Sequence, residues 1–511
     1  MKKIFVIATT VLAGLATTSC DSYLDINQSP DSPTEANMTA SIMMPAAEMN
    51  LVASYGDFLR IAGGYHAQYY SQTFGTSNYL DYSQFNMSAT RSSSTYTQLM
   101  SRTLKSLDQI LKIAREDEEW GTYLAATTLK AFTYQVLVDC YGEVPYTEAM
   151  MDLDNMSPKY DDGEFIYTAM IDSLDKAMAH IATGEEKVCT NILYPSEDPS
   201  DLTVTPVAYP WYQFATALKL RMLMRMSKVK DVKAQIQAII DEGALPEEDI
   251  KYADIWKEES GQASPFFSEE EWSKFGSTQK NVIANIALIG TMIQTVNGQG
   301  YEDPRLAAMF KPGDSGWSGG VSGTNFSTTK QYKSSYWCRP RVAYDDPVYF
   351  ITVAEIDFFL AEYYASIGDQ EAAKEYYDAA IDASFDTYGV EGADDNKALF
   401  PYDANNYQRC IGIAKWVALA GINTFEGWCE LRRLGYPAFG TTTGNDLYNE
   451  DTDTYSPDKY VPGTLYTPIK VFNQVGAGKV LQRYPYAESS SARNGNTPAF
   501  PGYTSPVFWA K

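Results

Sequence analysis

Residues 353–386 have the sequence VAEIDFFLAEYYASIGDQEAAKEYYDAAIDASFD, and this segment carries the clearest prediction of the fold. Two halves rich in apolar residues, alanine and tyrosine flank one glycine, as expected for two helices joined by a tight turn. Small side chains let the helices approach where they cross, and an aromatic ring packs each helix. The residues that set this pattern are Ala361, Tyr364, Gly368, Ala373, Tyr377 and Ala380.

These offsets match a tetratricopeptide repeat, in which one helix pair cannot bury its own apolar face. Further, more divergent pairs are therefore expected elsewhere in the chain. We predict an all-α scaffold of helical repeats, with more helix than the usual third of a globular protein. The segments with helical patterns are 97–141, with a buried helix over 122–141 that ends at Gly142, then 163–183, 208–241, and 402–434, broken near Gly421.

The net charge of the chain disfavours some classes of binding partner. Its 511 residues carry a formal net charge of −25, which argues against nucleic acid and anionic lipid surfaces. The 38 tyrosines exceed the 22 phenylalanines, and a tyrosine can both stack and hydrogen-bond, so contact surface is expected as well as core. Beyond the N-terminus, no apolar run is long enough to span a membrane.

The N-terminus has the features of a bacterial export signal that ends at Cys20. Lys2 and Lys3 precede a twelve-residue apolar segment, and small residues lead into the cysteine. A signal ending on a cysteine is typical of a lipid-anchored protein, although Thr17 stands where leucine is usual. The alternative is an ordinary secretory signal. We predict a signal peptide over 1–19, a lipidated tether over 20–40 and a single body over 41–511.

The other five cysteines are far apart and show no metal-site spacing. Buried thiols are the expected state, and one disulfide is possible outside the cytoplasm. They are Cys140, Cys189, Cys338, Cys410 and Cys429.

Some motifs resemble catalytic or metal sites, but the sequence around them lacks the other residues and elements that such sites require. Gly316–Gly320 matches a GxSxG nucleophile elbow, but no helix pattern follows it, and both histidines, His66 and His180, lie upstream. Alternating oxygen ligands over 25–31 suit calcium only superficially, because the glycine and glutamate of an EF-hand are absent. We predict neither an enzyme nor a cofactor. A carboxylate pair for glycan hydrolysis stays an alternative among 65 acidic residues.

Five segments in this order resemble the SusD/RagB superfamily of outer-membrane nutrient-binding lipoproteins, in its SusD-like branch. Each segment alone is weak, and the ordered set is more specific. In the family's helix-to-YGDVPY segment, Glu143 replaces the commoner aspartate. The segments are Cys20–Asn27, Leu129–Ala149 with its YGEVPY sequence, Ile351–Glu362, the EGWCELRRLGYP sequence of Glu426–Pro437, and the C-terminal Phe508–Trp509.

The resemblance implies four tetratricopeptide units that support a loop-rich face. It implies a location at the outer membrane, held by the lipid and facing the cell exterior. It also implies a partner, a TonB-dependent (SusC-like) transporter that the lipoprotein covers as a hinged lid. The cargo in such proteins is oligosaccharide in many members and peptide in some. The residues themselves do not separate these two cargoes.

Two loop-rich regions, 255–350 and 438–511, have weak periodicity, and segments of this kind usually carry function. Aromatic residues interleaved with amides occur near 65–86 and 317–341, and both segments correspond in order to glycan-site regions of the SusD-like family. Rings stack on the C–H faces of sugars while amides and charges hydrogen-bond hydroxyls. Trp317, between glycine and serine, is the preferred contact. The full set of candidates is Trp317, Trp337, Tyr336, Tyr332, Tyr79, Tyr82, Asn78 and Arg339.

Two other classes of protein compete with a nutrient-binding lipoprotein. A lipid-anchored glycan hydrolase needs two carboxylates roughly 5–10 Å apart in a cleft. A protein-binding scaffold would have a groove on the repeat helices and no aromatic loop platform. Trp211, Trp416 and Trp428 lie on helical faces and are expected in the core.

Overall fold

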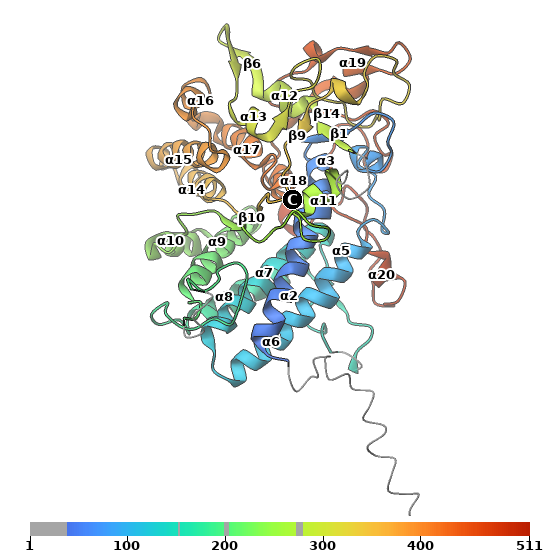
Figure 1. Cartoon of the computed structure of the whole chain (residues 1–511). Helices are drawn as coiled ribbons and strands as arrows, with labels where there is room; N and C mark the ends of the chain where they lie inside the picture. The colour runs from blue at the N-terminus through green and yellow to red at the C-terminus, as the bar shows by residue number, and fades with distance from the viewer. Residues whose placement is uncertain (1–37, 152–153, 199–203, 272–279) are drawn as a thin grey trace, which may run out of the picture.

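The computed structural model describes residues 38–151, 154–198, 204–271 and 280–511. The predicted signal peptide, Cys20, the 25–31 segment and most of the predicted tether lie outside these residues. Figure 1 shows α2 and most of the other helices of the first half of the chain in the lower half, with β6, α12 and α19 at the upper end. Helices α14 to α16 lie along one side between the two ends.

Helices make up 49% of the chain and strands 11%, which confirms the helix-rich scaffold. Its elements are antiparallel helix pairs, as expected for a repeat, and consecutive pairs pack on one another. An additional helix, α8 (Gly163–Met178), packs on the first two pairs. The pairs are α6 (Lys105–Glu116) with α7 (Trp120–Tyr141), α9 (Tyr209–Met226) with α10 (Lys233–Glu242), α14 (Val353–Ile367) with α15 (Gln370–Tyr388), and α17 (Tyr407–Leu419) with α18 (Thr424–Leu434).

The α14–α15 pair has the geometry that its sequence predicts. Gly368 ends α14 with φ at 89°, a left-handed conformation that glycine adopts without steric cost. The Tyr364 and Tyr376 rings stack across the pair with centroids 5.3 Å apart. The small and aromatic residues at the crossing are buried: Ala361, Ala373, Tyr377 and Ala380.

A continuous helical rod precedes the repeats and runs from the lower half of the molecule up to α18 (Figure 1). It consists of α2 (Ala40–Ser54), the π-helical η3 (Tyr55–Leu59) and α3 (Arg60–His66). Gly63 is required where α3 crosses α18, because a Cβ atom there would lie 2.6 Å from the Phe425 Cα. Helix α3, which precedes the repeats, therefore packs closely against α18, the last helix of the repeats.

The two loop-rich regions are more ordered than their composition indicates. Many of their residues form two-residue to six-residue strands and short helices, which need partners far away in sequence and so leave little local periodicity. Within the described residues the strands form seven two-stranded sheets. They pair as β1 (Tyr70–Gln72) with β5 (Val282–Ala284), β2 (Val144–Pro145) with β3 (Tyr160–Asp161), β4 (Ile250–Tyr252) with β10 (Val348–Ile351), β6 (Ile293–Val296) with β7 (Gln299–Glu302), β8 (Phe310–Lys311) with β9 (Arg339–Pro340), β11 (Ala438–Thr443) with β14 (Thr464–Thr467), and β12 (Tyr448–Asn449) with β13 (Thr454–Tyr455).

All sheets are antiparallel except the parallel β11–β14 pair. Short helices occupy the connections between repeats and strands. They are α4 (Leu80–Ser83), α5 (Ser93–Thr97), η4 (Gln98–Leu104), α11 (Pro265–Glu270), α12 (Ile286–Met292), α13 (Arg305–Met309), η7 (Ser334–Tyr336), α16 (Ala393–Leu399), η8 (Ala404–Asn406), α19 (Gly444–Leu447), η9 (Pro457–Lys459), α20 (Glu488–Ser491) and η10 (Phe508–Ala510).

The core contains the expected tryptophans and thiols. Trp211, Trp416 and Trp428 are at most 1% exposed. The five cysteines of the body are free thiols; four are buried and Cys410 is half-buried, so no disulfide forms among them. Among the helices that the structure describes, none combines the length and apolarity needed to cross a membrane.

Candidate functional site

The two aromatic segments singled out in the sequence meet in one surface, which we call the loop face. Strand β1 pairs with β5, and the Ala284 N–H on β5 donates to the Cys338 carbonyl of the second segment at 2.9 Å, so β5 lies between the two segments. The Gly75 N–H donates to the Asn325 carbonyl at 2.8 Å, and the Asn325 side-chain amide donates to the Thr76 carbonyl at 2.9 Å. The Lys333 ammonium lies 4.1 Å from the centre of the Phe74 ring. Segments about 250 residues apart thus share one surface.

Tyr332 and Tyr336 form the edge of an aromatic cluster in this face. Both rings are half-buried, with centroids 5.0 Å apart in an edge-to-face arrangement. Trp337 is only 1% exposed and packs against Phe326 at 4.5 Å and Tyr455 at 5.1 Å. The structure therefore places Trp337 in the core of this cluster, covered by its neighbours, and not among the accessible rings.

Trp317 occupies the position that the sequence favours, on a glycine-rich turn. Its ring is half-buried, and its indole N–H donates to the Glu302 carboxylate at 2.9 Å. Below it, the Ser315 and Ser318 hydroxyls donate to the Tyr336 carbonyl at 2.8 and 2.7 Å. These bonds fix the turn, so that a large ring is held in place at low entropic cost.

The same contacts account for the GxSxG motif. Ser318 is 6% exposed and its hydroxyl is directed at a carbonyl, not at a base. His180 stacks on Trp120 with ring centroids 3.8 Å apart, and His66 is fully buried beside Tyr484. The motif is therefore a structural turn, without the serine–histidine contact that a nucleophile elbow requires.

The first segment contributes Tyr79 and Asn78, but not Tyr82. Tyr79 is half-buried and its hydroxyl donates to the Glu269 carboxylate at 3.2 Å, while Asn78 is exposed and its amide bonds to Asn281. Tyr82 is 3% exposed because Tyr79 stacks on it with centroids 5.5 Å apart. In the structure Tyr82 thus lies behind the accessible Tyr79 ring and supports it.

Arg339 lies on β9 and is half-buried. Burial lowers the pKa of its guanidinium, which the nearby Glu270 carboxylate opposes. Glu270 accepts hydrogen bonds from the Asn281 and Val282 amides at 3.0 and 2.9 Å, and burial raises its pKa to about 8. Arg339 thus faces the buried acid that ties α11 to β5, on the side of the loop face where Tyr79 lies.

Asp57, on η3 near Tyr79, is expected to make the stability of the protein depend on pH. Burial raises the pKa of Asp57 to about 7, with a further contribution from Glu269. A folded-state pKa above the ordinary value of about 4 means that stability falls as the pH rises from about 4 to 7. We expect Asp57→Asn to stabilise the protein by roughly 1–3 kcal/mol at pH 7.5 and by much less at pH 4.5.

Urea denaturation of wild type and variant at both pH values measures this difference. The matched control is Asp394→Asn, since the Asp394 side chain is 99% exposed and should change stability little at either pH. An Asp57→Asn effect that is the same at pH 4.5 and 7.5 would contradict a raised pKa.

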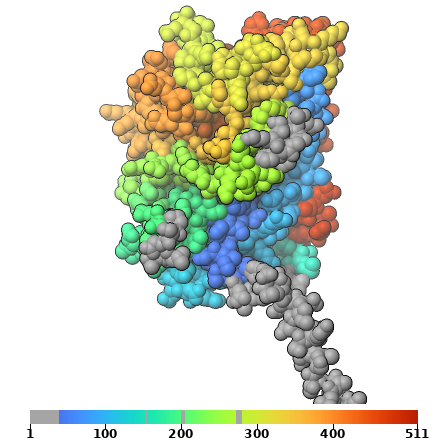
Figure 2. Space-filling model, in the orientation of Figure 1, coloured from blue at the N-terminus to red at the C-terminus, as the bar shows by residue number. Residues whose placement is uncertain are grey.

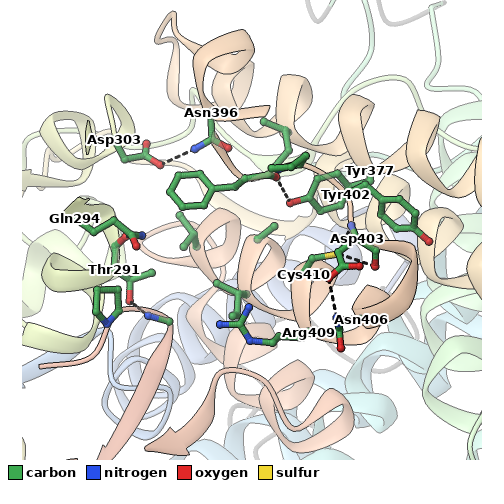
Figure 3. A pocket seen from close by; sticks show the side chains of 18 of the residues that line it. Thr291, Gln294, Asp303, Tyr377, Asn396, Tyr402, Asp403, Asn406, Arg409 and Cys410 are labelled. Atoms are coloured by element: carbon green, nitrogen blue, oxygen red, sulfur yellow. Dashed lines mark hydrogen bonds between the residues drawn. The ribbon is translucent and has the colours of Figure 1, made fainter. Parts of the chain in front are cut away.

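A cavity of about 670 Å³ lies beyond the β6–β7 hairpin. Figure 2 shows the yellow and orange segments side by side at the upper end, with a hollow between them. The lining comes from β6, β7 and the 462–463 turn on one side and from α15, α16, η8 and α17 on the other. In Figure 3, Gln294 and Thr291 lie on one side, Tyr402 and Asp403 on the other, and Arg409 reaches between them.

Sequence reasoning missed this cavity and two parts of the loop face. Tyr448 and Tyr455 complete the aromatic cluster from the 438–511 region, and Glu302 binds Trp317 from β7. The aromatic content of 438–511 was a usable signal for the two tyrosines. The cavity has no local sequence signal, because its walls come from segments that pair only in three dimensions.

A helical-repeat scaffold with an aromatic loop face defines a class of binding protein, and comparison with known proteins identifies the family. Residues 31–459 match the SusD-like family model described as "Starch-binding associating with outer membrane". The chain therefore belongs to the SusD-like family. A search of curated proteins gave no significant match.

Solved structures of SusD homologues have the same fold. A SusD homologue from Bacteroides uniformis is 19% identical, with a TM-score of 0.69 over 91% of this chain and 98% of that one. A chitin-binding SusD homologue from Flavobacterium johnsoniae is 17% identical, with a TM-score of 0.66 over 92% and 96%. A homologue from Bacteroides ovatus is 16% identical, with a TM-score of 0.66 over 92% and 99%.

Proposed function

We propose that this protein captures oligosaccharides at the loop face and delivers them to a TonB-dependent outer-membrane transporter. In this proposal a lipid on Cys20 holds it to the outer membrane, facing the cell exterior. The observation that carries the proposal is a set of three half-buried rings, Trp317, Tyr332 and Tyr336, on segments that the Ser315 and Ser318 hydrogen bonds to the Tyr336 carbonyl hold together. Fixed rings with one accessible face suit the flat C–H surfaces of sugars.

Polar groups around these rings provide the hydrogen bonds that sugar hydroxyls need. Glu302, Asn78 and Lys333 are exposed beside or near the aromatic residues and offer both acceptors and donors. The family description and the chitin-binding relative point in the same direction. Peptide cargo is the alternative, because tyrosines beside charged groups also suit a peptide.

We expect Trp317→Ala to weaken oligosaccharide binding by at least about tenfold, because a fixed tryptophan often carries most of a contact's energy. Isothermal titration calorimetry of the purified protein against starch and chitin oligosaccharides and a defined peptide pool measures it. The matched control is Trp120→Ala, which removes another half-buried tryptophan at the α6–α7 turn, far from β6 in Figure 1.

Three results would change the proposal. Binding of peptides alone would retain the capture role and replace the cargo. Equal loss of binding in the Trp317 and Trp120 variants would remove Trp317 from the site. If chromatography detected hydrolysis products of a bound oligosaccharide, the result would contradict a pure binding role and favour a glycan hydrolase.

A further inference from the structure

The cavity beyond the β6–β7 hairpin is a separate site from the loop face, although one strand contributes to both. Successive side chains of a strand point to opposite faces. On β7, Glu302 binds the Trp317 indole, whereas the Tyr301 hydroxyl accepts a hydrogen bond from the Asn396 amide at the cavity wall. A ligand in the cavity would therefore not touch Trp317, and the two sites can be tested independently.

The cavity has the size and the walls of a site for a small organic ligand. About 670 Å³ lies within the range of roughly 300–1,000 Å³ that such sites have. Three half-buried rings line the cavity: Tyr301, Phe400 and Tyr402. Phe400 packs edge-on against Tyr301 with ring centroids 5.4 Å apart. Aliphatic side chains complete the floor: Met292, Ile381, Ile413, Ala414 and Val417.

Arg409 is a charged lining residue that forms no ion pair within the described part of the chain, although its charge, after the hydrogen bond from Asn406, helps to lower the pKa of the Asp403 carboxyl in the same cavity. Its side chain is exposed on the first turn of α17, and it makes no hydrogen bond or ion pair with any residue that the structure describes. The other three charged lining residues are already engaged. Asp303 and Arg305 form an ion pair at 2.7 Å, and Asp403 caps its own turn, accepting from the Asn405 N–H and the Asn406 side chain.

Amide groups at the mouth remain available for hydroxyl groups. The Asn405 side chain is exposed and bonds to no described residue, and Gln294 uses only its NH₂ group, which donates to the Thr291 carbonyl at 2.6 Å. A backbone N–H that could receive a peptide carboxylate, that of Gly463, is already bound to the Thr291 hydroxyl at 3.0 Å. Rings, free amides and one guanidinium favour a sugar over a peptide terminus.

We propose that this cavity binds a sugar unit that carries a carboxylate, with Arg409 holding the carboxylate and Tyr402 or Phe400 facing the sugar ring. An arginine guanidinium matches a carboxylate through two parallel hydrogen bonds. Arg409 lies near Asp403 but forms no ion pair with it, so its guanidinium can still bind a carboxylate of a ligand.

Calorimetric titration of the purified protein with tri-galacturonate, tri-glucuronate and N-acetylneuraminate tests this assignment. Each acid is compared with its methyl ester. We expect at least one acid to bind more tightly than its ester. Arg409→Gln should lower the affinity of the protein for that acid roughly five- to tenfold. Arg409→Lys should retain part of the affinity and Arg409→Glu should abolish it. Arg493→Gln, at an exposed arginine after α20, is the matched control.

The variants also separate this site from the loop face. Arg409→Gln should leave the binding of neutral oligosaccharides unchanged, and Trp317→Ala should leave the binding of the acid unchanged. Failure of all three acids to bind, equal affinity for acid and ester, or an unchanged affinity in Arg409→Gln would overturn the proposal. Tight binding of N-acetyl-leucine with none of the acids would assign the cavity to a peptide carboxylate instead.

Discussion

Glu426→Ala is expected to destabilise the protein by about 3–5 kcal/mol, the cost of removing the carboxylate that two fully buried arginines share. Glu426 on α18 contacts Arg225 with one carboxylate oxygen and lies 3.4 Å from the Arg221 guanidinium with the other. All three side chains are 0% exposed. The substitution removes one negative charge from a site where water cannot replace it.

The contacts around Glu426 show why the loss would reach the whole scaffold. Arg221 also binds Glu355 on α14 through two bonds of 2.8 and 2.7 Å, and Arg225 also binds Asp139 on α7. Four helices, α7, α9, α14 and α18, thus meet in one buried ionic network. Removing its shared acid leaves Arg225 and Arg221 each with a single carboxylate.

The effect of Glu426→Ala should depend on pH in a defined direction. Burial alone would raise the pKa of Glu426, but Arg221 and Arg225 together outweigh it and hold the pKa below its usual value. A lowered folded-state pKa gives stability above the unfolded pKa of about 4, which is lost as the pH falls further. The difference between wild type and variant should therefore shrink from pH 7 to pH 3.

Urea denaturation followed by circular dichroism measures this difference at both pH values. Asp394→Ala is the matched control, because its ion pair with Lys397 is at the surface and is worth at most about 1 kcal/mol. A cost below about 1 kcal/mol for Glu426→Ala would show that the network contributes little to folding.

The sequence predicts those parts of the fold that depend on local periodicity. The 353–386 segment and its Gly368 turn are confirmed because helix contacts within a pair lie close in sequence. The same holds for α17 and α18, which end and begin on either side of Gly421, with φ at 72°. Gly63 shows the limit of such reasoning. A glycine is required at this position because Phe425, far along the chain, packs against it and leaves no room for a side chain.

The candidate site was predictable by region but not residue by residue. An aromatic residue in a loop has the same sequence signal whether it lies at the surface or in a local core. Trp317 and Trp337 illustrate this: the first stays half-buried on its turn, and the second is covered by Phe326 and Tyr455. The sequence around Arg409 gives no sign of a binding residue. Its proposed role depends on the β6–β7 hairpin, which faces it across the cavity.

Trp428→Ala is expected to cost about 3–5 kcal/mol, the usual loss when a large buried ring is truncated to a methyl group. Trp428 on α18 is 0% exposed, and Tyr484 stacks on it with ring centroids 5.0 Å apart. On the same ring, the Arg432 guanidinium lies 3.6 Å from the centroid. The substitution leaves a cavity between these two side chains that neither can fill without leaving its own contacts.

The role of Trp428 includes fastening the C-terminal segment to the last repeat. Its indole N–H donates to the Leu481 carbonyl at 2.9 Å, and Arg432 donates to the Gln482 carbonyl at 2.8 Å. Trp428→Phe keeps most of the ring and removes the donor, so its cost should be about 1–3 kcal/mol, mainly that of one unpaired buried carbonyl. Equal costs for the alanine and phenylalanine variants in urea denaturation would assign the effect to the hydrogen bond instead of the packing. If packing dominates, proteolysis should cut the 481–511 segment faster in Trp428→Ala than in Trp428→Phe, because the stacked Tyr484 loses its partner only in the former.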